Sequence, residues 1–180
     1  MKTIKLVVPT MEHKKAVMNF RQEFLNSNER ISGGVGLEQA DTYEKWLQHK
    51  YIPHYGLVDE NIFLAFNEQD YLVAISDIRL QLNDFIKTFA GQIGYSVRPS
   101  QRKMGYASEI LRLTLQQAAL KGFHCILITC NEPNIASAKV IEKNGGILEK
   151  VIPHLNYPNV KRYYVELSKE KNQQSPSTTR

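Results

Sequence analysis

The stretch from residue 91 to residue 130 constrains the fold of this chain more than any other. An apolar segment, 91–97, leads through a polar turn into an amphipathic segment, 104–121, which Gly122 ends. Glycine directly after the last periodic residue is a common helix stop. Apolar residues resume at once in 123–130, as a nearly continuous run that is typical of a strand buried on both faces. A strand, a long helix and a second strand in this order predict a sheet with helices packed on it.

The rest of the chain repeats this alternation of strands and helices. Strands lead into helices and back, which predicts one α/β domain built on a single mixed sheet. Counting the segments gives about seven strands and four main helices. The other helices are expected at residues 11–26, at 37–50 and from Asn134 to Gly145, and the other strands at 4–8, 61–66, 71–80, 147–152 and 162–167.

Length and residue usage favour one domain in a reducing compartment. A chain of 180 residues predicts one domain, over 1–168, and the polar segment 169–180 is expected to be a disordered tail. Cys125 and Cys130 lie in an apolar run, so both thiols are expected to be buried, and in a strand they face opposite ways. Without a disulfide framework, a signal peptide or an apolar run of ~18 residues, the protein is expected to be soluble and cytoplasmic, with no membrane partner.

Charge and histidine placement limit the classes of ligand. The net charge of +5 suits an anionic ligand, and equally it can serve solubility alone. A nucleic-acid-binding domain is the alternative that this charge raises, but no basic–aromatic stripe or helix-turn-helix pattern supports it, so no nucleic-acid partner is predicted. The histidines show no metal-ligand spacing, and we therefore expect no metal. They are His13, His49, His54, His124 and His154.

The turn before the long helix has the composition of an anion site. It carries Arg102 and Lys103 and is followed by Gly105 and the small Ala107. The first N–H groups of a helix have no partner inside it and lie at the positive end of the helix dipole. A residue without a side chain lets phosphate oxygens approach these groups, so the turn is predicted to hold a pyrophosphate. The alternative is that Gly105 only permits close packing at a helix start.

The segment Arg102-x-x-Gly105-x-Ala107 resembles the acyl-CoA pyrophosphate motif of the GNAT superfamily of N-acetyltransferases. A second resemblance follows where an asparagine, Asn134, opens a helix that closes in Glu-Lys-x-Gly at Gly145. Physically, Asn134 can cap that helix and nothing more, or it can also offer its amide group to a ligand. The resemblance implies acetyl-CoA as the co-substrate. It implies that the cofactor contacts come from Tyr95, Val97, Arg102, Lys103, Met104, Gly105, Tyr106, Ala107, Asn134 and Ser137.

The same resemblance implies the architecture and the reaction. The sheet is expected to be mostly antiparallel and twisted, with the two central strands, ending near Val97 and Cys130, splayed around the pantetheine arm. An acetyl group would pass by direct attack to the primary amine of a small molecule or a peptide. Homodimers are common in the family. The tyrosine that many members use to protonate the leaving thiolate is replaced by Ile141, so a hydroxyl such as that of Ser137, or water, is expected to act instead. A non-catalytic acyl-CoA-binding sensor is the alternative.

Candidate residues for the acceptor side come from the two strands and two helices before the cofactor motif. Asp77 is the expected proton acceptor, because a charge is out of place in a central strand. Arg79 lies on the same face, so a purely structural Asp77–Arg79 ion pair is an equal alternative, and Arg79 is otherwise expected near the substrate. The resemblance implies that Trp46, with Tyr43 and the loop 32–36, lines the acceptor site, whereas the spacing of Trp46 alone favours packing.

Overall fold

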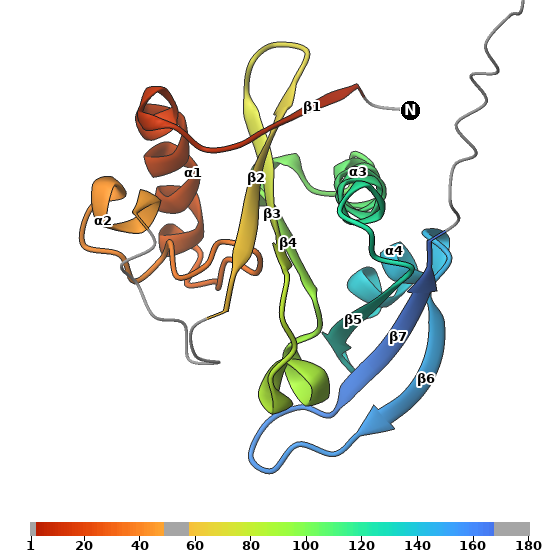
Figure 1. The fold of residues 1–180 in the computed structure, drawn as a ribbon. Helices are drawn as coiled ribbons and strands as arrows, with labels where there is room; N and C mark the ends of the chain where they lie inside the picture. The colour runs from red at the N-terminus through yellow and green to blue at the C-terminus, as the bar shows by residue number, and fades with distance from the viewer. Residues whose placement is uncertain (1–2, 49–57, 168–180) are drawn as a thin grey trace, which may run out of the picture.

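The computed structural model describes residues 3–48 and 58–167 (Figure 1). Its seven strands form two antiparallel sheets, one of four strands and one of three. The first sheet has the order β1-β2-β3-β4 and the second the order β5-β7-β6. The strands are β1 (Ile4–Val7), β2 (Glu60–Asn67), β3 (Leu72–Arg79), β4 (Ile93–Val97), β5 (Cys125–Asn131), β6 (Ile147–Ile152) and β7 (Val160–Glu166).

The two sheets meet where β4 begins. The backbone N–H of Gln92 donates to the carbonyl of Leu127, with an N···O distance of 2.7 Å. In return, the N–H of Leu127 donates to the side-chain oxygen of Gln92 at 3.0 Å. No ladder joins β4 to β5 in the described part of the chain, so the two strands touch at this point and are splayed beyond it. The expected mostly antiparallel α/β fold with splayed central strands is confirmed, and the expected single sheet is divided at the splay.

Helices cover both faces of the four-stranded sheet (Figure 1). On one side lie α1 and α2, and on the other lies α3, with α4 next to it against the second sheet. Short helical turns precede α1, precede β4 and follow β4. The helical segments are η1 (Met11–His13), α1 (Lys14–Asn26), α2 (Tyr43–Leu47), the π-helix η2 (Ile86–Ala90), η3 (Pro99–Gln101), α3 (Tyr106–Leu120) and α4 (Ile135–Lys143).

The helix expected over residues 37–50 is much shorter in the structure. Only Tyr43–Leu47 is helical, and the end of the expected segment lies outside the described residues. Thr42 has an extended backbone, with ψ of 157°, and its hydroxyl accepts a hydrogen bond from the N–H of Lys45. This threonine therefore begins a new helix, and the apolar residues before it reach the core from a series of turns.

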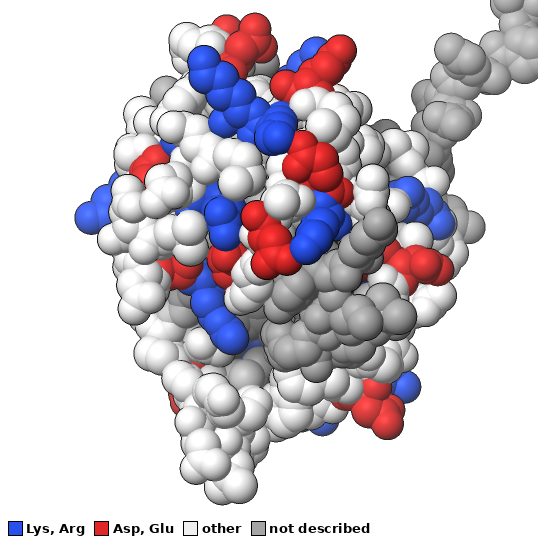
Figure 2. Space-filling view, turned by 90° about the vertical axis from the view of Figure 1, so that its left-hand side faces the viewer, with Lys and Arg blue, Asp and Glu red and all other residues white. Residues whose placement is uncertain are grey.

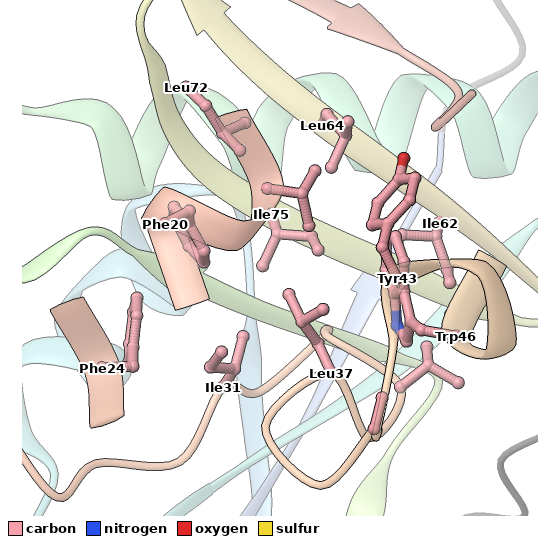
Figure 3. Close-up of a cluster of buried hydrophobic side chains, with 13 residues drawn as sticks. Phe20, Phe24, Ile31, Leu37, Tyr43, Trp46, Ile62, Leu64, Leu72 and Ile75 are labelled. Atoms are coloured by element: carbon pink, nitrogen blue, oxygen red, sulfur yellow. The ribbon is translucent and has the colours of Figure 1, made fainter. Parts of the chain in front are cut away.

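Two hydrophobic layers hold the helices to the sheets. On one face, Phe20 and Phe24 of α1 and Trp46 of α2 pack on Leu64 and Ile75 of the sheet (Figure 3). The opposite face packs against α3, and α4 continues that layer beside β5 and β7. The core thus leaves the splay between β4 and β5 as the junction of the two layers.

The cysteines differ from the expectation in one respect. Both are free thiols, but Cys125 is exposed and only Cys130 is buried. Cys125 is the first residue of its strand, where the helix layer no longer covers it. The expected disordered tail, 169–180, lies outside the described residues. Across those same described ranges, no helix has the length and apolar character that a bilayer crossing needs.

Candidate active site

The turn between β4 and α3, where the sequence predicts an anion site, leads directly into the first turn of α3. Gly105 is the N-cap of α3, with φ of +90°, and no side chain caps the helix. A Cβ atom at this glycine would meet nothing within 4 Å. The close-packing alternative is therefore wrong, because the backbone conformation and not the space requires glycine here. The positive φ of Lys103, 62°, gives the turn a second left-handed residue.

A pocket of about 730 Å³ opens over the first turn of α3. Met104, Gly105 and Tyr106, three of the residues predicted to contact the cofactor, line it. The end of α4 closes the other side with Lys143 and Asn144. The volume falls in the range of small-molecule sites, about 300–1,000 Å³. Ala107, in contrast, is half-buried against the core below the turn.

Arg102 is engaged by an acidic residue from the other side of the sheet. Its guanidinium donates to both carboxylate oxygens of Glu29, at 3.0 and 2.7 Å. Arg102 Nε also donates to the carbonyl of Val97 at 3.3 Å. The hydrogen bond from Arg102 holds the pKa of Glu29 below its ordinary value, against the opposing effect of burial. The phosphate contact expected of Arg102 stays a prediction.

Arg98 is a structural hub that the sequence reasoning missed. It is 2% exposed, and it donates to the carbonyl of Leu72 at 2.9 Å and to Asn19 and Tyr71 at 2.8 and 2.7 Å. Glu23 of α1 forms an ion pair with Arg98 at 3.1 Å, and its other oxygen accepts from the N–H of Ser100 at 2.6 Å. Helix α1 thereby fixes the end of β4. An arginine directly before proline at the end of an apolar run was the signal available in the sequence.

Asn134 and Ser137 lie at the start of α4, beside the splay. The side-chain oxygen of Asn134 accepts from the N–H of Ser137 at 3.0 Å, which confirms the cap. The hydroxyl of Ser137 is 2.9 Å from the hydroxyl of Tyr95 on β4. Burial raises the pKa of Tyr95 to about 12, and the hydrogen bond with Ser137 opposes this rise. The two hydroxyls therefore span the gap between β4 and α4.

Ile141 is a core residue in the structure. It is fully buried and packs in the layer beneath β5 and β7. A Cβ atom added to Gly146 would lie 2.4 Å from its side chain, so the chain also turns tightly around it. Ile141 does not line the pocket, and its side chain carries no group that could donate a proton.

Asp77 and Arg79 form the buried ion pair that the sequence raised as an alternative. Asp77 Oδ2 lies 3.1 Å from Arg79 Nε, and the exposed fractions of the two side chains are 0% and 8%. The other carboxylate oxygen of Asp77 accepts from the N–H of Gly94 on β4 at 2.8 Å. Arg79 donates further to the carbonyl of Gly91 at 2.8 Å. The pair therefore ties β3 to the start of β4, next to the splay, and a role of either residue toward a substrate stays a prediction.

Trp46 and Tyr43 are both 1% exposed, in the layer between α1 and the sheet (Figure 3). The indole N–H donates to the carbonyl of Gly34 at 2.7 Å. The loop over Ser32–Gly36 lies on β4, because a Cβ atom at Gly33 would be 2.5 Å from the carbonyl oxygen of Gly94. The loop thus reaches β4 through its backbone, and the hydrogen bond from Trp46 holds the loop in place. The acceptor contact expected of Trp46 stays a prediction.

The surface around α1 and α2 carries charges of both signs (Figure 2). Basic and acidic side chains alternate over the part of this face that described residues form, and pairs such as Lys14–Glu44, at 2.6 Å, join them. Within residues 3–48 and 58–167, no three histidine, cysteine or acidic side chains come together as metal ligands.

Comparisons with known proteins agree with this geometry. A family model for the acetyltransferase (GNAT) domain matches residues 7–147. An uncharacterized N-acetyltransferase of Bacillus subtilis, YnaD, is 34% identical over 86 residues, which are 45% of this chain and 51% of that protein. The chain therefore matches about half the length of this curated relative.

Solved structures show the same fold at lower identity. The ribosomal L7/L12 α-N-protein acetyltransferase RimL, in complex with coenzyme A, has a TM-score of 0.67 and 19% identity, covering 93% of this chain and 96% of its own. The dodecameric spermidine N-acetyltransferase of Vibrio cholerae has a TM-score of 0.62 and 18% identity, covering 96% and 98%.

Proposed function

This chain belongs to the GNAT acetyltransferase family, and from that premise we propose that it transfers an acetyl group from acetyl-CoA to a primary amine. The start of α3 is the single observation that carries the proposal. There, Gly105 is left-handed, no side chain caps the helix, and a pocket opens directly above. Backbone amides at a helix N-terminus bind phosphate oxygens well, and this turn offers them without a competing side chain.

The residues present fit the cofactor along the whole path from pocket to splay. Lys143, at the far wall of the pocket, adds a positive charge for the phosphates. The splay between β4 and β5 leaves backbone groups of β4 unpaired toward β5, as pantetheine amides and a thioester carbonyl require. Asn134 and Ser137 contact the arm from the α4 side in this proposal, as do Tyr95 and Val97 from β4.

The chain's own residues then divide the chemistry between them. The attacking nitrogen must lose a proton, because an alkyl amine with a pKa of ~10.4 is almost wholly protonated near neutral pH. Asp77 is the proposed proton acceptor, acting through water. Its oxygen Oδ2 forms the ion pair with Arg79 and accepts no hydrogen bond from the described residues. When the carbon–sulfur bond breaks, its electron pair stays on sulfur, and the hydroxyl of Ser137 donates a hydrogen bond to that thiolate.

The acceptor is proposed to be a small-molecule or peptide amine. Two of the similar structures act on spermidine and on a ribosomal protein, so the same fold accepts both classes. A second copy of the chain is a proposed partner, since one of these proteins is dodecameric. We place the reaction in the cytoplasm, where acetyl-CoA is made available.

A panel of amines tests the proposal directly. Purified protein is incubated with acetyl-CoA and each of a set of polyamines, amino acids, aminoglycosides and short peptides, and released CoA is measured with a thiol reagent. Turnover on at least one class, with an acetylated product of the correct mass, is the expected result. Tight CoA binding by calorimetry with no turnover on any amine would instead establish the non-catalytic sensor.

A further inference from the structure

The hydroxyl of Tyr95 has no part in the reaction described so far, yet it makes the polar contact between β4 and α4. Its oxygen lies 2.9 Å from Ser137 Oγ and 3.5 Å from the carbonyl oxygen of Ser137. Both partners belong to one residue at the first turn of α4. The side chain of Tyr95 therefore crosses from the cofactor strand to the residue that faces the leaving sulfur.

The acidity of the two hydroxyls favours Tyr95 as the donor. A phenol, with a pKa near 10, is far more acidic than an alkyl alcohol and is the stronger hydrogen-bond donor. In this protein burial raises the pKa of Tyr95 to about 12, so its proton stays in place across the physiological range. The distance of 2.9 Å suits donation in either direction, and with Tyr95 as the donor the proton of Ser137 is left for a third group.

A buried thiol lies near the two hydroxyls. Cys130 lies at the end of β5 and is 8% exposed, and burial raises the pKa of its thiol. Lys161 and then a hydrogen bond with the side chain of Ser137 oppose that rise. A hydroxyl that accepts one hydrogen bond becomes a better donor in the next, because chains of hydrogen bonds polarise one another.

We propose that Tyr95 is a positioning residue, which holds Ser137 Oγ in the splay so that its proton points at the thiolate of CoA. This inference rests on the proposed function, because it needs CoA in the splay. A serine in the first turn of a helix otherwise turns its hydroxyl toward backbone carbonyls three or four residues earlier. Tyr95 prevents this rotation through its hydrogen bond to Ser137. A tyrosine hydroxyl from β4 thus takes part near the leaving sulfur, although position 141 carries isoleucine. No proton leaves Tyr95 in this arrangement.

The pKa of the bound CoA thiol gives a test that needs no acceptor amine. Thiolate absorbance near 240 nm is followed from pH 6 to 10 in the CoA complex, and the spectrum of the desulfo-CoA complex is subtracted so that protein tyrosines and cysteines cancel. Hydrogen bonds to a thiolate favour the charged form and lower its pKa. We expect Ser137→Ala to raise the pKa of the bound thiol by about one unit, and Tyr95→Phe by about half a unit.

The double variant separates positioning from a structural role. If Tyr95 acts through Ser137, Tyr95→Phe produces no further shift in the Ser137→Ala background. The matched control is Tyr164→Phe on β7. The hydroxyl of Tyr164 accepts a hydrogen bond from Arg162 at 3.0 Å, so this variant should leave the thiol pKa unchanged. An unchanged thiol pKa in Tyr95→Phe, with CoA still bound, overturns the inference and leaves the proposed function intact. Failure of the wild-type protein to bind CoA in calorimetry overturns both.

Discussion

Substituting Gly105 separates the cofactor site from the stability of the fold. A side chain at φ of +90° costs about 1–2 kcal/mol in backbone strain. It meets no atom within 4 Å, so no steric term is added. For a chain of this length the strain corresponds to a fall in Tm of roughly 2–8 °C. Gly105→Glu should therefore still fold.

The effect on CoA binding should be much larger than the effect on folding. A carboxylate about 5 Å from a phosphate charge is repelled by about 3 kcal/mol at an effective dielectric constant of about 20. One such charge alone weakens binding by about 100-fold, and the second phosphate adds to this. Isothermal titration with CoA measures the loss. Gly105→Gln has the same backbone strain and similar volume without the charge, and it should retain far more affinity.

The chain supplies its own control at the other end of the same helix. Gly122 has φ of +88°, and a Cβ atom there also meets nothing within 4 Å. Gly122→Glu should lower Tm to a similar degree, with a few tenths of a kcal/mol more from the helix dipole, and leave CoA affinity unchanged. Wild-type affinity in Gly105→Glu, or equal losses in the two glutamate variants, would refute the assignment of the diphosphate site.

Three further predictions follow from individual contacts. Ile141→Tyr should not raise activity and should cost about 1–3 kcal/mol in urea denaturation, because the ring has no space in the core; a faster enzyme would show that this position does reach the thiolate. Asp77→Asn should lower the free energy of unfolding by about 3–5 kcal/mol, since it leaves the Arg79 charge buried without its partner. The double variant with Arg79→Met should recover stability, and full activity in it would exclude Asp77 as the proton acceptor. Glu29→Gln should free Arg102 and increase CoA affinity up to about five-fold. Because the pKa of Glu29 is lowered from 4.5, its ion pair contributes fully to stability above pH 4.5, and this contribution is lost as the pH falls below that value. Acid titration of Glu29→Gln should therefore lack this loss of stability. Identical acid titrations of Glu29→Gln and the wild type would show that the ion pair contributes nothing to stability.

The parts of the fold that the sequence predicted are those whose signal is local. Gly105 and Gly122 mark the ends of α3, and both are left-handed in the structure. The apolar run before Cys130 predicted a strand in the right place, and the residues at its centre are buried. These features depend on the backbone conformation of single glycines and on burial averaged over several residues, and the local order of residue types indicates both.

The parts that the sequence did not predict depend on distant partners. Helical spacing continues through Thr42, yet the helix begins only after this residue, because the preceding segment brings its apolar residues to the core through a series of turns. The π-helix at Ile86–Ala90 has no periodic signal. The structural role of Arg98 depends on its hydrogen bonds to Asn19 and Glu23, which are more than seventy positions away in the sequence. Likewise the contact between Tyr95 and Ser137 exists only once two separate elements are placed side by side.

The approach of Gly33 to Gly94 bears on how a protein of this kind can change its choice of amine. A Cβ atom at Gly94 would lie 2.6 Å from the nitrogen of Gly33, and one at Gly33 would lie 2.5 Å from the oxygen of Gly94. Neither position accepts any other amino acid without moving the main chain. If this loop lines the acceptor site as proposed, a mutant library aimed at new acceptors should therefore leave both glycines untouched and vary their neighbours Ser32 and Ser96, which lie outside the hydrophobic core.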